Sequence, residues 1–410
     1  MFGRDDNMSV NDFFTEKKEW SKVKDAVLGC YLKPYFNKVL SQGSVTYVDS
    51  FAGKGKFDDG NLGSPLIAYN VGFESIEAKK KQGIYHRQIK YIFIDNQYAD
   101  ELEANTSGMS DIKIVDGTYQ DNISEILKEV KTRNIFVYID PFGIKYLNQD
   151  FFLKMFEKRV EDYSIETLVN FNSFGFIREA CRLLQSTKVS ELHSLTEKLE
   201  ERNDKESYGS FEVHNDINNM NNIAGGEYWQ NIVKRYSNNE INMNEAEVLL
   251  AEKYTITLRN YFKHTISFPI KSKEHNSVPR YRLVFCTNYY QGYLLMVDNM
   301  QRRHKESIEN IEVHPSLFEF DISSGNKILE FNYEDIFLEF VTGVYIDLYK
   351  IIIKALDKYS ISLDVKKFIS AGKSLESSGI INVLRNPAYT KRGKRRTYFA
   401  WNKSIKIKKK

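Results

Sequence analysis

Short apolar runs that end in an acidic or amide residue recur from residue 45 to residue 172. They are 45–49, 91–95, 112–116, 135–140 and 167–172, and the segments between them carry apolar residues at helical intervals. A short β-branched run is typical of a buried strand, and strands that alternate with helices pair in parallel. The pattern predicts a doubly wound, Rossmann-like α/β sheet.

Helical periodicity accounts for much of the remaining chain. Apolar positions between 12 and 40 predict one or two amphipathic helices. Lys22 and Lys24 could face a ligand carboxylate, but helix lysines are usually solvated, and we expect these two to be so. Residues 66–73 are the expected first crossover helix. Residues 178–262 are predicted to form a largely helical insertion into the sheet domain.

The insertion and the segment after it contain recognisable boundaries. The asparagine-rich stretch 215–222 predicts a loop and Gly225-Gly226 a break. The aromatic stripe that follows the break is typical of a helix packed in the core. Residues 265–270 and 281–286 are predicted as the last two strands, as an antiparallel edge of the sheet.

The pattern changes beyond residue 305. We predict a sheet domain over 12–305, a connector over 306–332 and a small domain over 333–410. The small domain combines helical segments with two strand-like runs, 380–384 and 397–401, around a basic loop. Three helices and a two-stranded wing make a winged helix-turn-helix of about 75 residues.

The distribution of charge indicates a partner. The net charge is +3 over 410 residues, but residues 380–410 hold eleven Lys or Arg and no acid, which leaves −8 on residues 1–379. A basic end of this kind predicts a polyanion, here DNA or RNA, as the partner.

Other features of the composition exclude several classes of protein. The three cysteines lie far apart and match neither a disulfide framework nor a zinc spacing, and the seven histidines show no metal-ligand spacing. We therefore expect no metal and a reducing, cytoplasmic location. The sequence shows neither a secretory leader nor a long apolar run, so we expect no membrane span.

A glycine turn after the first strand is the strongest chemical signal. It consists of Asp49, Ser50, Phe51, Ala52, Gly53, Lys54 and Gly55. Glycines allow the backbone to turn and to approach a ligand closely. A dinucleotide site would have a third glycine where this chain has Asp58, and an acid there suits a cationic sulfonium better than a pyrophosphate. The turn predicts an S-adenosylmethionine (SAM) site, with a merely structural strand–turn–helix as the alternative.

Acids at the ends of the next strands extend this prediction. Asp95 can accept both ribose hydroxyls of an adenosine, or can instead cap the following helix. Asp116 is a candidate acceptor for the adenine amine. Ser64, in a Gly-Ser-Pro sequence, is expected to cap a helix that has Pro65 at its first position.

The fourth strand ends in Asp140-Pro141-Phe142-Gly143. This sequence resembles the Asp-Pro-Pro-Tyr motif of amino-methyltransferases, in which the acid and a proline carbonyl accept hydrogen bonds from an exocyclic amine and the aromatic ring stacks on the base. The catalytic candidates are thus Asp140, Pro141 and Phe142, although Phe142 stands one position early. A plain Asp-Pro turn is the alternative.

The basic loop near the carboxyl end contains the nucleic-acid-binding candidates. They are Lys391, Arg392, Lys394, Arg395 and Arg396, bracketed by Tyr389 and Tyr398. A wing of this composition can track phosphates or enter a minor groove, whereas an ordinary charge run is only solvated.

Taken together, these motifs resemble those of the three-Cys-motif partner protein family, TcmP. The resemblance rests on residues 48–55, 63–66, 139–143 and 281–285 and extends over nearly the whole chain. It implies a class I methyltransferase fold with a C-terminal winged helix, and a radical-SAM-like three-cysteine protein as a partner. It also implies that Asp49, Gly53, Gly55 and Asp95 line a SAM site and that Asp140 and Pro141 face the acceptor.

The sequence thus predicts a SAM-dependent methyltransferase that acts on nucleic acid, with an exocyclic amine of a base such as adenine as the candidate acceptor. The substitution of Phe142-Gly143 for Pro-Tyr leaves an alternative open. In that alternative the chain is a catalytically degenerate, DNA-binding accessory subunit of the three-cysteine partner, in a phage or defence context. Methylation of a protein or a small molecule is a third possibility.

Overall fold

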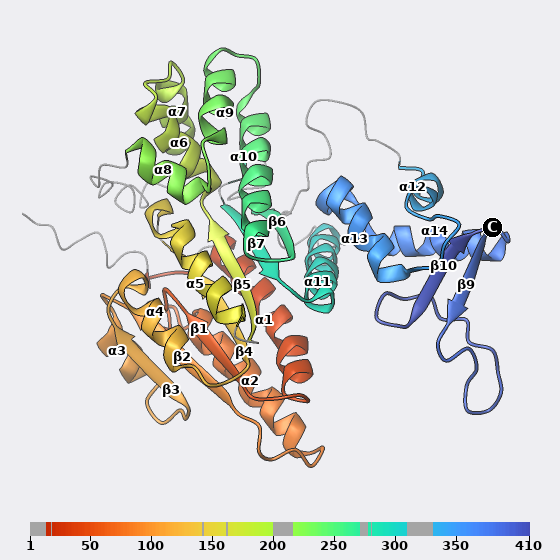
Figure 1. Cartoon of the computed structure of the whole chain (residues 1–410). Helices are drawn as coiled ribbons and strands as arrows, with labels where there is room; N and C mark the ends of the chain where they lie inside the picture. Colours follow the sequence, from red (N-terminus) through yellow and green to blue (C-terminus); the bar gives the residue numbers. More distant parts are fainter. Residues whose placement is uncertain are drawn as a thin grey trace, which may run out of the picture. The chain divides into compact units, whose positions relative to one another are not determined.

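The computed structural model describes residues 14–17, 19–141, 143–160, 163–199, 216–270, 278–279, 281–309 and 331–410. The chain divides into two compact units. The first unit comprises the described parts of residues 1–288 and 303–319, and the second those of 289–302 and 320–410. Figure 1 shows the helices and strands of both units.

The first unit is built on a seven-stranded sheet in the order β3-β2-β1-β4-β5-β7-β6. The strands are β1 (Val45–Asp49), β2 (Ile89–Asp95), β3 (Ile112–Asp116), β4 (Asn134–Ile139), β5 (Ser164–Phe171), β6 (His264–Ile270) and β7 (Tyr281–Thr287). The first five pair in parallel, and β7 lies antiparallel between β5 and β6. The predicted doubly wound α/β sheet is confirmed, and its strand order reverses between β1 and β4.

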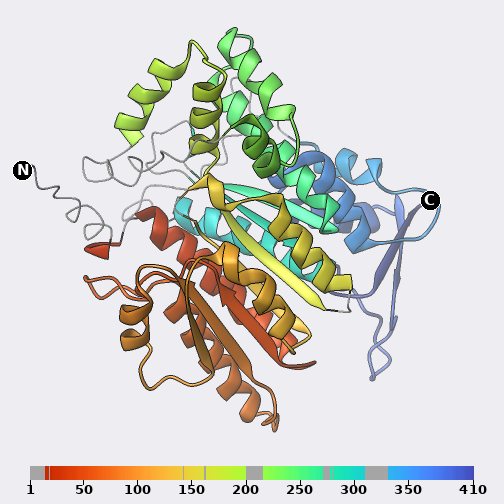
Figure 2. The same ribbon diagram turned by 60° about the vertical axis from the view of Figure 1, so that its left-hand side comes forward.

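Helices cover both faces of this sheet, which is why its central strands are apolar throughout (Figure 2). On one face Tyr31 of α1 (Glu19–Val39) contacts Phe136 of β4, and α1 packs against α2 (Ser64–Lys80). On the other face α4 (Tyr119–Glu129) and α5 (Gln149–Val160) share a core with Val48 and Val137. The short helix α3 (Ala99–Asn105) follows β2.

The predicted helical insertion is present as five helices that gather beyond β5 (Figure 1). They are α6 (Ser173–Leu183), α7 (Val189–Leu199), α8 (Ile217–Ala224), α9 (Tyr228–Ser237) and α10 (Met243–Thr257). The loop predicted for 215–222 is wrong, because α8 occupies most of it. The Asp216 side chain caps this helix, Met220 and Ile223 are buried, and Gly225 ends it with a φ of 73°.

The second unit contains helices α12 (Tyr333–Glu339), α13 (Leu348–Tyr359) and α14 (Val365–Ser377), together with α11 (Tyr290–Glu309) as far as Arg302. Its three-stranded antiparallel sheet has the order β8-β10-β9. The strands are β8 (Ile346–Asp347), β9 (Ile381–Arg385) and β10 (Ile405–Lys409).

Two details of the second unit explain its packing. A Cβ on Gly372 would lie 2.5 Å from the Phe337 ring, so this glycine lets α12 and α14 approach closely. The strand predicted at 397–401 is wrong, because the partner of β9 is β10. Ile405 and Ile407 supply the two buried, alternating apolar positions that the earlier run lacks.

None of the helices in the described ranges combines the length and the apolarity that crossing a bilayer requires.

Candidate active site at the carboxyl edge of the sheet

Three neighbouring strands of the first unit deliver polar side chains to one edge of the sheet. Ile139 of β4 pairs with Val169 of β5, so Asp140 and Asn170 follow side by side. Ser50 follows Asp49 at the end of the neighbouring strand β1, level with Ile139. This is the point at which the strand order reverses, where open α/β sheets bind their ligands.

Asp140 is the hub of a hydrogen-bond network at this edge. Its carboxylate accepts from Lys24 Nζ at 2.9 and 2.7 Å, from Asn170 Nδ2 at 2.6 Å and from the Tyr138 hydroxyl at 3.2 Å. The predicted neighbour Pro141 is buried, and Phe142 lies outside the described residues. The network brings Asp140 into contact with a helix and a strand that the motif alone did not indicate.

Lys24 is not solvated, and that prediction is wrong. Only 7% of its surface is exposed, because α1 lies over the sheet and directs the lysine towards Asp140. The Lys24 ammonium also stands 5.3 Å from the centroid of the Tyr281 ring. A carboxylate and an aromatic face are both favourable partners for a cation.

Two further carboxylates lie near Asp140, and burial raises the pKa of both. Burial raises the pKa of Asp49 to about 7, although its hydrogen bonds with the Ser64 side chain, the Phe51 amide and the Tyr47 hydroxyl oppose the shift. The charge of Asp140 adds to the increase. Burial likewise raises the pKa of Asp25 to about 6, against the attraction of Lys17. Both carboxyl groups therefore keep a proton to a higher pH than usual, and a cation placed beside them would favour their charged form.

Ser64 has a different role from the one predicted. Gly63, not Ser64, is the N-cap residue of α2, and no side chain caps this helix end. The Ser64 side chain instead lies close enough to Asp49 to oppose the increase in the pKa of this acid. Pro65 is the second residue of α2, not the first as predicted. The Gly-Ser-Pro sequence thus connects α2 to the acid that ends β1.

The glycine turn has the expected left-handed backbone, with φ of 57° at Gly53 and 76° at Gly55. Its closest neighbour is the chain itself, because a Cβ on Gly53 would lie 2.8 Å from the Phe14 ring. Phe14, Phe57 and Tyr98 form a small aromatic cluster there, with 4.8 Å between the centroids of the Phe14 and Tyr98 rings. The amino-terminal segment therefore packs directly over the turn.

Asp95 is held by backbone amides. One carboxylate oxygen accepts from Gly53 N at 2.8 Å, and the other from Gln97 N and Tyr98 N at 2.9 Å each. A carboxylate offers about four acceptor positions, so these bonds leave room for one more donor. Asp95 does not cap α3, whose N-cap residue is Tyr98 and has no side-chain cap. Its bonds instead fix the turn before α3 and the glycine turn, and they leave the ribose interpretation open.

The remaining cofactor candidates surround this turn. Ala52 is buried, and its amide donates to Ile94 O at 3.0 Å. Phe51 is half-buried, with ring centroids 5.9 Å from Tyr119 and 5.4 Å from Tyr146. Asp116 is exposed at the end of β3, where it pairs with Asp95 in the sheet register.

The basic candidates of the second unit lie on a tight hairpin between β9 and β10. The Thr390 amide donates to Lys394 O at 2.9 Å, and Gly393 turns the chain with a φ of 75°. Lys391, Arg392, Lys394 and Arg395 are exposed, whereas Arg396 is half-buried and donates from Nε to Tyr389 O at 3.2 Å. The hairpin therefore presents four of its five cations to solvent.

Lys24, Ser50 and Asn170 are the members of the edge that the sequence did not mark as functional. Asn170 and Asn172 alternate with apolar residues, but only Asn170 reaches Asp140. The Asn172 side chain caps α6 by accepting from Gly175 N at 2.7 Å. A polar residue at the end of a buried strand was the available signal for Asn170. Lys24 belongs to an ordinary helical pattern, which favoured a solvated side chain over one that faces a carboxylate.

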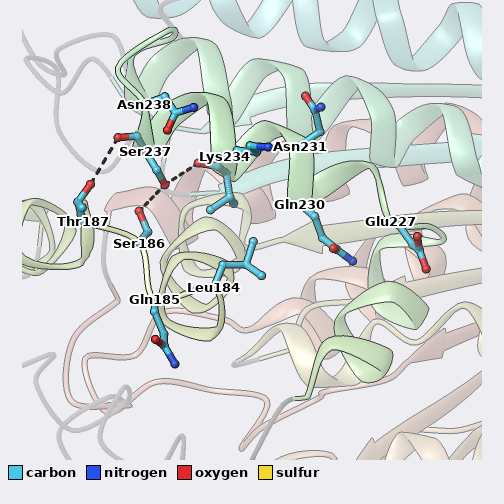
Figure 3. A pocket seen from close by; sticks show the side chains of 11 residues that line it. Leu184, Gln185, Ser186, Thr187, Glu227, Gln230, Asn231, Lys234, Ser237 and Asn238 are labelled. Atoms are coloured by element: carbon cyan, nitrogen blue, oxygen red, sulfur yellow. Dashed lines mark hydrogen bonds between the residues drawn. The ribbon is translucent and has the colours of Figure 1, made fainter.

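Two other features of the described residues carry no chemistry. They contain no group of three or more His, Cys, Asp or Glu side chains positioned for a metal. A cavity of about 650 Å³ lies between the residues that follow α6 and helix α9 (Figure 3). Two of its polar groups bond to each other: the Ser186 and Ser237 hydroxyls lie 2.6 Å apart, and Ser237 also donates to Val233 O at 2.8 Å.

Comparisons with known proteins give only distant similarity. No protein-family model matches the chain. No curated protein matches it either.

Among solved structures, protein LPL1258 of Legionella pneumophila is 7% identical, with a TM-score of 0.34, and the match covers 68% of this chain and 91% of that one. A spermidine synthase in complex with the transition-state analogue AdoDATO is 8% identical, with a TM-score of 0.31 and coverages of 74% and 72%. A loganic acid methyltransferase with SAH is 11% identical, with a TM-score of 0.27 and coverages of 70% and 99%.

Proposed function

We propose that the first unit is a SAM-dependent methyltransferase and that its acceptor is an exocyclic amine of a nucleic acid. The observation that carries this proposal is the polar edge where the strand order reverses, with a buried Asp49 and a partly buried Asp140 near a glycine turn. Such an edge suits a ligand that bears a sulfonium and an ammonium. A mostly parallel sheet with one antiparallel strand near its edge also resembles methyltransferase folds.

The residues present fit a polar, cationic cofactor in one further respect. Ser50 Oγ and Asn170 Oδ1 are both buried at this edge without a hydrogen-bond partner in the described structure. Buried polar atoms of this kind usually have a partner, such as water or a ligand. Gly53 and Gly55 would admit the cofactor along their backbone, Asp49 would face its cationic part, and Asp95 and Asp116 would take the nucleoside.

When bound, SAM would supply a methyl group on a sulfonium. Transfer to the acceptor nitrogen would leave a neutral thioether, and the nitrogen would lose a proton to a carboxylate or water. Asp140 would orient the acceptor by accepting one of its N–H bonds. Because Lys24 now donates to both oxygens of Asp140, the ammonium has to move aside when the acceptor binds.

We propose that the second unit is a winged helix that binds the nucleic acid. The support is its order of three helices and a small antiparallel sheet, with an exposed basic hairpin between β9 and β10. The cations of such a hairpin neutralise phosphates and release counterions.

Cofactor binding and methyl transfer test the first part of the proposal. Titration calorimetry with SAM is expected to give micromolar affinity, and tritiated SAM is expected to label DNA or RNA. Wild-type protein that shows no SAM binding would falsify the proposal.

Salt-dependent binding tests the second part. The double variant Lys391→Ala, Lys394→Ala is expected to weaken binding of a duplex and to lower the slope of log K against log salt by about two, one for each lost phosphate contact. Lys128→Ala with Lys131→Ala, exposed lysines of the first unit, is the matched control. Equal salt slopes for both double variants would refute a role for the hairpin.

A second candidate is a catalytically degenerate subunit that delivers a radical-SAM-like three-cysteine partner to DNA. Its support is the Lys24 ammonium, which donates hydrogen bonds to both oxygens of Asp140 and so occupies the proposed acceptor position. Transfer of the tritiated methyl group to nucleic acid by the isolated chain would eliminate this candidate. The candidate would be favoured if the chain binds DNA but transfers no methyl group, whether the partner protein is absent or present.

A further inference from the structure

Asn170 is an unusual residue for the end of a buried strand. It is only 2% exposed, and its two polar atoms have different surroundings. Nδ2 donates to Asp140 Oδ1 at 2.6 Å, whereas Oδ1 is enclosed and has no partner among the described residues. The enclosed oxygen requires an explanation, because buried acceptors without a donor are rare and costly.

The orientation of the Asn170 amide is fixed by its neighbour. If the amide were reversed, Oδ1 would face the Asp140 carboxylate and the two acceptors would repel each other. The present orientation therefore leaves the oxygen, not the nitrogen, available. Asp140 and Asn170 together offer two acceptors from adjacent strands, β4 and β5.

The Lys24 ammonium, which now binds Asp140, indicates which kind of ligand group these two acceptors can bind. Lys24 places a primary ammonium against both carboxylate oxygens and 5.3 Å from the centre of the Tyr281 ring. A primary amine with two N–H bonds on one nitrogen would satisfy Asp140 and Asn170 at the same time. A secondary amine has one N–H and would leave one acceptor unpaired.

We propose that Asn170 is a specificity-determining residue of the acceptor subsite: its Oδ1 accepts the second N–H of a primary amino group whose first N–H is bound by Asp140. This inference rests on the proposed function, because it names the acceptor chemistry of the same site. The acceptor displaces the Lys24 ammonium, and the flat base to which its amine belongs lies towards Tyr281. Substrates without an exocyclic primary amine are rejected because the buried Asn170 oxygen would then stay unpaired.

Nucleoside binding tests this inference without methyl transfer. Adenosine and purine riboside, which is adenosine without its exocyclic amine, are titrated into the full-length protein and followed by nuclear magnetic resonance. Wild type is expected to prefer adenosine on the order of tenfold or more. Cytidine and its amine-free analogue form a second pair, so that either base can show the preference.

The variant Asn170→Leu keeps the side-chain volume but has no acceptor, and it is expected to lose the preference. Thr167→Val is the matched control, because Thr167 is a fully buried residue of the same strand whose hydroxyl donates to Val137 O at 2.9 Å, away from Asp140. The control is expected to keep the preference. If Asn170→Leu does not fold, as judged by thermal melting, Asn170→Ala takes its place.

The outcomes separate this inference from the proposed function. Wild type that does not distinguish amine from amine-free nucleosides, including binding of neither, overturns the role of Asn170 whether or not the protein binds SAM. A preference that survives in Asn170→Leu overturns it too. A preference that depends on Asn170 in a protein that fails to bind SAM supports the subsite and removes only the methyltransferase proposal.

Discussion

Two ion pairs in the first unit each join a carboxylate to a basic side chain, but their surroundings differ. Glu247 of α10 receives both arms of the Arg282 guanidinium, at 2.7 and 2.5 Å, and the Ser173 hydroxyl at 2.5 Å. Its side chain is fully buried and that of Arg282 is 9% exposed. The pair of Lys24 and Asp140 is more open, with 9% and 22% of the side chains exposed.

The difference shows in which pair a ligand can replace the cation. We call Glu247–Arg282 the closed pair and Asp140–Lys24 the open pair. A guanidinium is a rigid fork that matches a carboxylate, and Ser173 donates a third hydrogen bond to Glu247. This closed pair ties the helical insertion to β7. A lysine ammonium is a compact charge on a flexible stem. Here it is held by Asp140, whose other partner Asn170 has an oxygen without a donor. The open pair is therefore suited to exchange its cation for a ligand.

The variant Glu247→Gln tests the closed pair and is expected to show the largest loss of stability. Removing one charge leaves Arg282 buried without compensation, which costs about 3–5 kcal/mol in free energy of unfolding. Urea denaturation measures this loss. Glu240→Gln, at an exposed pair with Arg235, is the control and is expected to change the stability by less than about 0.5 kcal/mol. Equal values for the two variants would mean that the closed pair does not hold the insertion.

The variant Asp140→Asn tests the open pair through its function. Methyl transfer is expected to fall by a factor on the order of 10²–10³, the loss typical when one polar group that supports the reacting atoms is removed. SAM affinity is expected to stay within about threefold, because Asp140 faces the acceptor. Asp100→Asn, an exposed acid on α3, is the control for a general effect of charge. A loss of folding similar to that of Glu247→Gln would instead assign Asp140 a structural role.

The pH dependence of SAM binding tests the carboxylate beside the open pair. Burial raises the pKa of Asp49 to about 7, so this group is partly protonated at neutral pH. A cationic ligand favours the carboxylate, and SAM affinity is therefore expected to rise between pH 6 and pH 8, by up to about tenfold per unit below the pKa. Calorimetry across this range measures the effect, and Asp49→Asn is expected to flatten it. A fall in affinity with rising pH would contradict the assignment.

The contribution of Asp49 to the stability of the folded protein should fall as the pH rises, whereas SAM affinity should increase. Its pKa in the folded protein lies above the ordinary value of 3.8, so the folded state binds the proton more tightly than the unfolded state does. The contribution of this group to stability is fully present below about pH 4 and is lost as the pH rises towards 7. In urea denaturation, Asp49→Asn should remove this part of the pH dependence.

The variant Lys24→Met is expected to show the smallest change in stability. Asp140 would keep its hydrogen bonds from Asn170 and Tyr138 and its partial exposure, so the loss should stay near 1 kcal/mol. The same variant is expected to bind adenosine more tightly, because the competing ammonium is gone. A loss as large as that of Glu247→Gln would erase the distinction between the two pairs.

The alternation of strands and helices was readable from the sequence because buried parallel strands are continuous apolar runs. Each of the first five strands was placed to within three residues at either end. The failures have local causes. An asparagine-rich segment folded as α8 because Asp216 caps it and Met220 and Ile223 bury one face. The last strand was placed too early because two isoleucines separated by a lysine are a weaker signal than an aromatic run.

The candidate site was only partly readable for a different reason. Asp49, Asp95 and Asp140 follow strands, and a strand end is visible in a sequence. The partners of Asp140 come from a helix and from a strand far along the chain, and Lys24 looks like any helix lysine until α1 is laid on the sheet. Contacts between distant segments depend on packing, which no local pattern reports.

The segment that packs over the glycine turn has a practical consequence for handling the protein. Phe14 O accepts from Asp58 N at 2.8 Å, and Lys17 N donates to Asp59 Oδ2 at 2.9 Å. These two hydrogen bonds hold residues 14–17 against the loop after Gly55. An affinity tag fused close to Phe14, or a truncation that removes it, would disturb the surroundings of Gly53. Hydrogen exchange at the Asp58 amide would report whether a given preparation has kept this segment in place.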